Sequence, residues 1–250
     1  MRTLISFITF YAFLVALFEV AAEPLSDIDL RYESQRTFED YLKIRDALQA
    51  NLLAAPDSFD LNWRVTRVLY ALGEKAENAG AQIAFFNQCA EQAKRMTISF
   101  PGKAEGYYLN ALCRGKKGQV EGLMSGLLVV SQLKRNMEIA IRLDPKIESG
   151  GPHRALGRLY NDLPGFFGGD LKKSIWHLKQ AVKIAPHFSD NHLFLAKAFY
   201  NNRQMKEAER SLIYFFETDP NEKDAKLGQK LLRSIRLKLN TANAQGINDK

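Results

Sequence analysis

The chain has 250 residues, a formal net charge of +7 at pH 7 and 46% hydrophobic residues, with two cysteines and four histidines. This length allows one large domain or a repeat array with a substantial buried surface. The basic balance favours acidic protein partners or anionic lipid. The aromatic and basic residues are not interleaved as they are in nucleic-acid-binding proteins, so we expect no nucleic-acid partner.

Residues 1–22 have the pattern of an export signal. Arg2 is followed by an apolar stretch at residues 4–18 and by small residues at residues 20–22. The apolar stretch is shorter than the roughly 20 residues that a membrane-spanning helix needs. A cleaved signal peptide is therefore our interpretation, and an uncleaved anchor is the alternative. We expect an exported protein whose single helical-repeat domain occupies residues 23–240.

Prolines divide the rest of the chain into segments of similar length. Each proline follows a segment with helical apolar periodicity and precedes another, and three segments end in the similar sequences RLDP, KIAP and ETDP. The prolines are Pro56, Pro101, Pro145, Pro186 and Pro220. The last two lie 34 residues apart, and a fixed spacing of this size is typical of helical repeats. The spacing predicts helical hairpins that recur along the chain.

The last two units carry small and large side chains where two packed helices need them. Small residues let neighbouring helices approach closely, and large residues fill the remaining space. One unit has Leu156, Gly157, Tyr160, Ser174, Leu178 and Ala181, and the other has His192, Leu195, Ala196, Phe199, Ala208, Leu212 and Phe215. This pattern resembles the tetratricopeptide repeat, a helix–turn–helix unit that stacks into solenoids.

Two further hairpins precede these units. Trp63 and Tyr70 mark the first helix of one, and Tyr107 and Ala111 mark the first helix of the next, whose second helix is lengthened. Residues 37–56 form a lone second helix before them. The sequence therefore predicts an all-α fold, in which antiparallel helical hairpins stack as a short solenoid.

An amphipathic helix over residues 222–240 follows the repeats. Repeat arrays need a terminal element with a polar outer face, so we interpret it as a capping helix. A basic surface for a membrane or a partner is the alternative. Residues 241–250 are expected to be a flexible tail. Asp57-Ser58 and Asp170 are the expected N-caps of two helices, because their side chains can accept hydrogen bonds from free amides.

No pattern typical of catalysis or of metal binding occurs. The sequence has no GxSxG elbow and no Walker loop, and its histidines form neither HxxxH nor HExxH. We therefore expect no enzyme activity, no cofactor and no metal site. Cys89 and Cys113 fall on neighbouring antiparallel helices, so a disulfide between them is geometrically possible. Two buried thiols are the alternative.

The glycine-rich stretch Gly150–Asp170 contains the first candidate binding site. His153 and Arg154 stand at a predicted helix start, where anions can bind. Phe166 and Phe167 lie on a hairpin loop that is longer than the repeat requires. These two rings are either buried in the array or exposed towards a groove or a partner. In the second case the loop is a binding site.

A second candidate lies on the lengthened helix, in the apolar segment Glu121–Leu133. Leu123, Met124 and Leu127 belong to a stretch that is apolar nearly all round. One interpretation is a helix buried in the core of the array. The other is an exposed apolar surface that serves oligomerisation or binds an apolar ligand.

A narrower resemblance rests on the segments AEGYY, LDPKIESGGPHRALGRLYNDLPGFFGGDLKKSIWHLKQAVKIAP and NHLFLAKAF. These resemble the T component associated with tripartite ATP-independent periplasmic transporters. The resemblance implies a periplasmic accessory protein that engages a solute-binding protein, holds an apolar ligand and forms oligomers. The chain departs from lipidated members because it has no cysteine near the signal. Membrane contact would then require an uncleaved signal or the basic terminal helix. The alternative function is a structural adaptor that gathers envelope proteins on its concave face.

Overall fold

The computed structural model describes residues 24–34 and 37–248, so the export signal predicted at residues 1–22 lies outside the described residues. Within these ranges the chain forms eleven α-helices and one 3-10 helix, and no strand. They are α2 (Leu25–Ser34), α3 (Phe38–Ala54), α4 (Phe59–Lys75), α5 (Ala79–Ser99), α6 (Ala104–Glu121), α7 (Leu123–Leu143), α8 (Ile147–Asp162), η1 (Gly165–Phe167), α9 (Leu171–Ile184), α10 (Ser189–Asn201), α11 (Met205–Glu217) and α12 (Glu222–Asn248). The predicted all-α fold class is confirmed.

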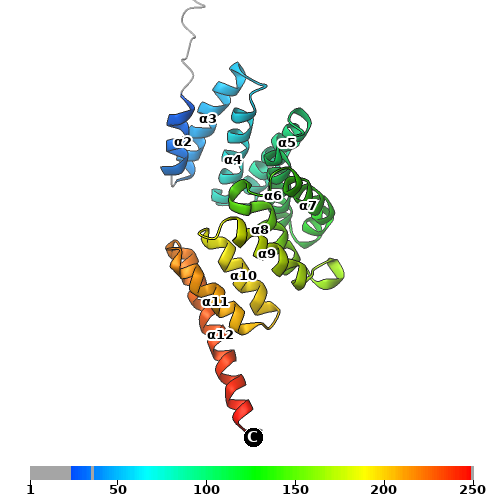
Figure 1. Cartoon of the computed structure of the whole chain (residues 1–250). Helices are drawn as coiled ribbons and strands as arrows, with labels where there is room; N and C mark the ends of the chain where they lie inside the picture. Colours follow the sequence, from blue (N-terminus) through cyan, green and yellow to red (C-terminus); the bar gives the residue numbers. More distant parts are fainter. Residues whose placement is uncertain (1–23, 35–36, 249–250) are drawn as a thin grey trace, which may run out of the picture.

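Consecutive helices pack as hairpins, α2 with α3 and so on to α10 with α11, and α12 lies against α11 at the end of the stack (Figure 1). This is the predicted solenoid of helical hairpins. One element was missed, because α2 precedes α3 and completes a hairpin where the sequence predicted a lone helix. Ile28 is the only buried residue of α2. A ten-residue helix with one buried side chain has too short an apolar pattern to be recognised.

The residues that the repeat pattern placed at the helix contacts of the last two units are buried, whereas Trp63, Tyr70 and Tyr107 of the earlier units are partly buried. In the last two units, Ala181 and Ala196 have no exposed surface. At Gly157 a Cβ atom would lie 2.4 Å from Cγ of Leu178, so only glycine lets α8 approach α9 this closely. The alternation of small and large residues is therefore the physical basis of the stacking.

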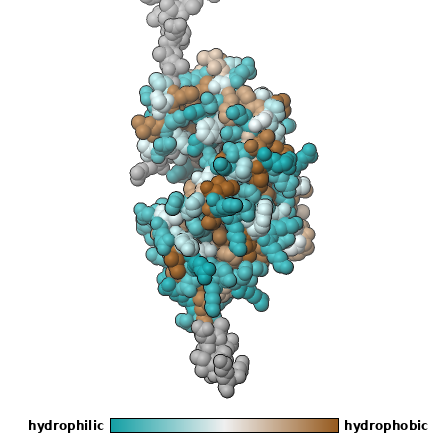
Figure 2. Space-filling model, in the orientation of Figure 1, coloured by the Kyte–Doolittle hydropathy of each residue, from teal (hydrophilic) through white to brown (hydrophobic). Residues whose placement is uncertain are grey.

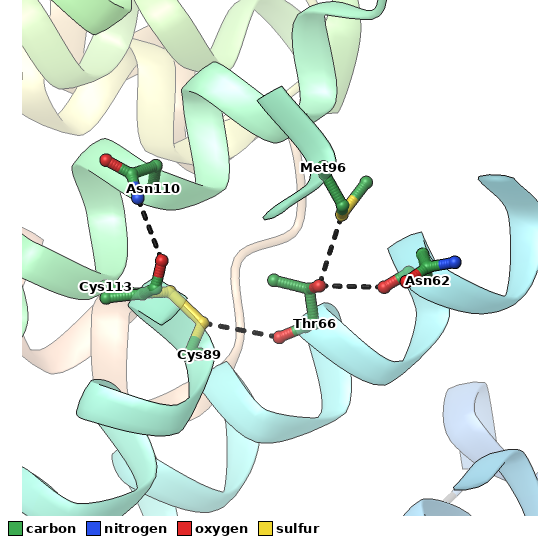
Figure 3. Close-up of a disulfide and its surroundings, with 7 residues drawn as sticks. Asn62, Thr66, Cys89, Met96, Asn110 and Cys113 are labelled. Carbon is green, nitrogen blue, oxygen red and sulfur yellow. Dashed lines mark hydrogen bonds between the residues drawn. A yellow bond between two sulfur atoms is a disulfide. The ribbon is translucent and has the colours of Figure 1, made fainter. Parts of the chain in front are cut away.

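Cys89 of α5 and Cys113 of α6 are joined by a disulfide, with their Cα atoms 5.8 Å apart (Figure 3). Both cysteines are fully buried. Sγ of Cys89 also lies 3.4 Å from the carbonyl oxygen of Thr66 on α4. Asn110 donates a hydrogen bond from Nδ2 to the carbonyl oxygen of Ala90, at 2.9 Å. The bond and its surroundings thus tie α4, α5 and α6 together.

Helix ends follow the predicted capping. Ser58 accepts a hydrogen bond from the amide of Leu61 at the start of α4, and Asp170 accepts two, from the amides of Lys172 and Lys173, at the start of α9. These side chains satisfy amides that a helix start leaves free.

The last helix, α12, packs one face against the final hairpin and so caps the end of the array. Ile235 is fully buried against the core of the final hairpin. The helix continues to Asn248, through most of the segment that the sequence assigned to a flexible tail. No proline interrupts residues 241–248, which removes the usual reason for a helix to end. Among the described helices, none is both long and apolar enough to cross a membrane.

Candidate functional site

The first helices of five successive hairpins line one groove, of about 260 Å³. We call it the central groove. Its polar lining comes from α2, α4, α6, α8 and α10, and includes the left-handed turn within the start of α8. These residues are Tyr32, Arg67, Tyr70, Tyr108, Glu148, Arg154, Arg158 and Asp190. Figure 2 shows the surface hollowed between the N-terminal helices and the last hairpins. A curved stack of hairpins gathers its first helices on one side, and this brings residues far apart in sequence together.

The three arginines of the groove differ in their partners. Arg67 lies 3.5 Å from the carboxylate of Glu148, measured from Nε to Oε1. Arg154 donates hydrogen bonds from Nη1 to the carbonyl oxygen of Ser149 and to Oδ1 of Asn191, at 3.1 and 3.0 Å. None of its hydrogen bonds goes to a carboxylate.

Arg158 has the least neutralised charge of the three. Its guanidinium lies over the ring of Phe194, 4.2 Å from the ring centroid. It forms no hydrogen bond or ion pair with any residue that the structure describes. The amine of Lys197 lies over the same ring, at 5.0 Å, and burial together with the charge of Arg158 lowers the pKa of Lys197. In the lining itself the three arginines exceed the two carboxylates, Glu148 and Asp190, by one charge, so the groove can accept an anion.

The tyrosines supply neutral hydroxyl groups. Burial raises the pKa of Tyr32, Tyr70 and Tyr108, so all three are protonated at neutral pH. Burial also raises the pKa of Asp190. The groove thus combines guanidinium groups, phenols and aromatic surface, which suits peptide recognition through hydrogen bonds and stacking.

His153 and Arg154, predicted to form one anion site, are separated by the structure. Residues 148–150 form a left-handed turn, with φ of 47°, 56° and 78°. The regular part of α8 begins after this turn. Arg154 donates hydrogen bonds to the carbonyl oxygens of Glu148 and Ser149 in the turn, and it also lines the groove. His153 is buried, and its Nδ1 lies 3.0 Å from Nδ1 of His177 on α9. Of these two residues, only Arg154 is therefore available to an anion in the groove.

Phe166 and Phe167 are exposed, by 83% and 41%, so the interpretation that they are buried is wrong. Their ring centroids lie 4.4 Å apart on η1. Neither ring lines the central groove. The carbonyl oxygen of Gly168 accepts a hydrogen bond at 3.0 Å from the amine of Lys134, so this loop is tied to α7.

The apolar segment of α7 is likewise not buried in the core. Leu123 and Met124 are exposed by 73% and 71%. Leu123 and Leu127 line a cavity of about 490 Å³ between α6, α7 and α8, which we call the apolar cavity, whereas Met124 does not line it. The cavity shares Tyr70 and Arg158 with the central groove. Of the two interpretations of this segment, the exposed apolar surface is therefore the one that the structure has.

Several groove residues were missed from the sequence, although a signal for them exists. Arg67 and Tyr70 are three residues apart, and Arg154 and Arg158 are four apart, so each pair shares a helix face. No group of three or more metal-ligating side chains occurs within residues 24–34 and 37–248. The described part of the groove also contains no thiol, because both cysteines are in the disulfide.

Comparisons with known proteins agree with this architecture. Among solved structures, the chain is similar to TTC0263, a thermophilic TPR protein in Thermus thermophilus, with a TM-score of 0.61 and 18% identity over 80% of this chain and 92% of that one. This similarity shows the fold of a tetratricopeptide-like repeat protein. The chain is also similar to MamA, with a TM-score of 0.47 and 19% identity over 75% of this chain and 92% of that one. Its similarity to yeast Tom70 has a TM-score of 0.39 and 9% identity over 85% of this chain and 63% of that one. Both similarities are too weak to support a conclusion.

A search among curated proteins finds no match. A family model described as "Regulator of microtubule dynamics protein 1-3" matches residues 25–159. The matched segment is more than half of the 250 residues. It contains seven of the eight polar groove residues, from Tyr32 to Arg158. The chain belongs to the family of regulator of microtubule dynamics proteins 1-3.

Proposed function

We propose that the protein is a non-catalytic adaptor that binds an acidic segment of a partner protein in the central groove. The observation that carries the proposal is the excess of positive charge in that groove. Neither Arg154 nor Arg158 forms a hydrogen bond or an ion pair with a carboxylate among the described residues, although the charges of both act on Asp190 of the same groove. A glutamate or aspartate of a bound segment would supply such a partner. The hydroxyls of the partly buried Tyr32 and Tyr70 would hydrogen-bond its backbone.

Fold and family support the same conclusion. Tetratricopeptide-like repeats place the first helices of their hairpins on one continuous concave surface, and such surfaces bind extended segments. The groove is lined from five hairpins, which matches an elongated ligand better than a compact one. The matched family is named for microtubule dynamics. We therefore include polymerised tubulin among the partners to be tested.

The experiment measures binding of a short fluorescent peptide of alternating glutamate and leucine, with a lysine–leucine peptide for comparison. We expect the acidic peptide to bind and added salt to weaken binding. Arg158→Glu should lower the affinity by about tenfold or more, because it puts a like charge opposite the ligand. Arg210→Glu is the matched control, since Arg210 is an exposed arginine of α11 outside the groove. Equal binding of the two peptides would refute the proposal.

The place of action is a separate proposal. We propose that residues 1–22 direct export to the periplasm, on the basis of their charge and apolar pattern. N-terminal sequencing of the protein from fractionated cells would test it, and we expect mature chains that begin near Glu23. Recovery of full-length protein in the cytoplasm would contradict export.

A transport role remains a prediction from sequence resemblance alone. The family model that matches the chain is that of regulator of microtubule dynamics proteins 1-3, and it gives no support to the T component of the periplasmic transporters. Capture of a solute-binding protein by the purified chain would support the role, whereas capture of other envelope proteins alone would support an adaptor.

A further inference from the structure

The apolar cavity is built by the lengthened hairpin of α6 and α7, which have 18 and 21 residues. At Gly118 a Cβ atom would lie 2.9 Å from Cα of Gly126, so the backbones of the two helices touch there. The cavity lies on the side of this hairpin that faces α8. Glycines 115, 122 and 126 line it. At Gly122 a Cβ atom would meet nothing within 4 Å, whereas at Gly115 it would lie 2.8 Å from Cδ2 of Leu133, so Gly115 lets that leucine pack closely.

This space is not an ordinary packing defect. Protein interiors contain few voids larger than a water molecule, whereas pockets of about 300–1,000 Å³ are typical of small-molecule sites. The cavity, at about 490 Å³, falls in that range. Leu127, Val130 and Leu133, which are spaced three residues apart on α7, line it. No residue of α7 before Met137 is buried, so this apolar wall faces the cavity and solvent.

Three charged side chains line the cavity, those of Lys116, Arg158 and Asp162. Lys116 is already paired, with its Nζ 2.8 Å from Oε1 of Glu74. Asp162 keeps its negative charge, because its hydrogen bond at 2.8 Å comes from the neutral amide of Asn161. Arg158 has no ion pair or hydrogen bond with a described residue, and its guanidinium lies over the ring of Phe194. The free cation of the cavity is therefore Arg158.

We propose that the apolar cavity binds an amphipathic aliphatic carboxylate, with its chain against Leu127, Val130 and Leu133 and its carboxylate on the guanidinium of Arg158. A guanidinium binds a carboxylate through two parallel hydrogen bonds, which fixes the headgroup at one end. Burial of the chain supplies most of the affinity, since each methylene removed from water contributes about 0.8 kcal/mol. The proposal does not depend on peptide binding in the central groove.

Dodecanoate is the test ligand, and its binding to the full chain is measured by calorimetry below its micelle concentration. Dodecanol tests the role of the charge, and acetate tests the role of the chain. We expect dodecanoate to bind with a negative heat-capacity change, as burial of apolar surface requires. Acetate should not bind. Dodecanol should bind more weakly by about ten- to a hundredfold, because it lacks the charged hydrogen bonds.

Two adjacent leucines provide a matched pair of variants. Leu127→Trp places a larger side chain in the cavity and should abolish dodecanoate binding. Leu128→Trp changes a neighbour that is 80% exposed and does not line the cavity, so it should leave binding unchanged. Arg158→Gln should remove the preference for dodecanoate over dodecanol. Thermal unfolding of each variant shows whether it is folded.

Three outcomes would overturn the proposal. Dodecanoate could bind equally well to wild type and Leu127→Trp. Lysophosphatidylglycerol could bind while dodecanoate does not, which would assign the cavity to a phospholipid headgroup. The wild-type chain could bind no dodecanoate and form a dimer that Leu127→Trp dissociates. This result would show that a second copy of the chain covers the apolar wall. Leu127 does not line the central groove, so binding of the acidic peptide by Leu127→Trp is measured independently.

Discussion

Acidification should destabilise the protein through the pair formed by the buried His153 and the partly buried His177. Nδ1 of His153 lies 3.0 Å from Nδ1 of His177, so one ring donates and the other accepts while both are neutral. The ring of His177 stacks on Tyr160, with the ring planes 17° apart. Burial lowers the pKa of both histidines, and for His177 the charges of His153 and Lys173 add to this. Protonation of the accepting ring would put an N–H on both Nδ1 atoms, so two hydrogen-bond donors would face each other.

The size of the effect follows from the pKa of His177, which falls from 6.5 to about 4 in the folded state. Between these values the unfolded chain binds a proton that the folded chain does not, so stability rises with pH. Stability is therefore complete above about pH 6.5 and falls as the pH drops, until the folded imidazole is protonated near pH 4. One pH unit is worth about 1.4 kcal/mol, so at pH 5 His177 alone costs about 2 kcal/mol of unfolding free energy. His153 acts in the same direction.

Urea denaturation at pH 7.5 and pH 5 measures this loss in the wild type and in His177→Phe. The phenylalanine keeps an aromatic ring but cannot titrate, so the variant should lose about 2 kcal/mol less than wild type between these pH values. His187→Gln is the control, because His187 is exposed on the turn before α10. An equal loss of stability in wild type and His177→Phe would refute the reasoning, since other groups would then carry the pH dependence.

Three further changes test the packing. Replacing Cys89 and Cys113 together by serine should lower the unfolding free energy by about 3 kcal/mol in urea titrations, because the disulfide closes a loop with a sequence separation of 24; equal stability with and without reductant in the wild type would contradict this. Gly169→Ala should cost about 1–3 kcal/mol by thermal unfolding, since its Cβ would overlap the carbonyl oxygen of Leu163, whereas Gly165→Ala meets no neighbouring atom and should be nearly neutral. Asp170→Ala should cost about 1 kcal/mol through loss of the α9 cap, and an unchanged melting temperature would show that solvent replaces it.

The architecture could be predicted because the packing of repeats leaves local marks in the sequence. Gly157 and Leu178 are 21 positions apart, yet each occupies a recognisable position in a hairpin whose length the prolines define. The caps Ser58 and Asp170 are recognisable because a helix start needs an acceptor at one fixed position. Helix α2 lacked such a mark, since Ile28 is its single buried residue and Leu25 and Tyr32 pack against the core only partly buried.

The central groove could not be predicted because it depends on how the hairpins curve around one another. Its lining runs from Tyr32 to Asp190, and no local pattern relates those two positions. His153 and Arg154 show the same limit on a smaller scale. They are adjacent in sequence, but adjacent residues of a helix do not face the same side. One therefore packs against α9 and the other faces the groove.

Arg158 connects the two proposed sites, because it lines both the central groove and the apolar cavity. A single guanidinium cannot form two parallel hydrogen bonds with a peptide carboxylate and with a fatty-acid carboxylate at once. The two ligands should therefore compete, although most of their contacts lie in different places. Thermodynamic linkage requires the effect to be reciprocal, so dodecanoate must weaken the acidic peptide by the factor by which the peptide weakens dodecanoate. In Arg158→Gln both factors should approach one, because the shared guanidinium is gone. If competition persists in this variant, the coupling depends on other residues that line both sites, such as Tyr70.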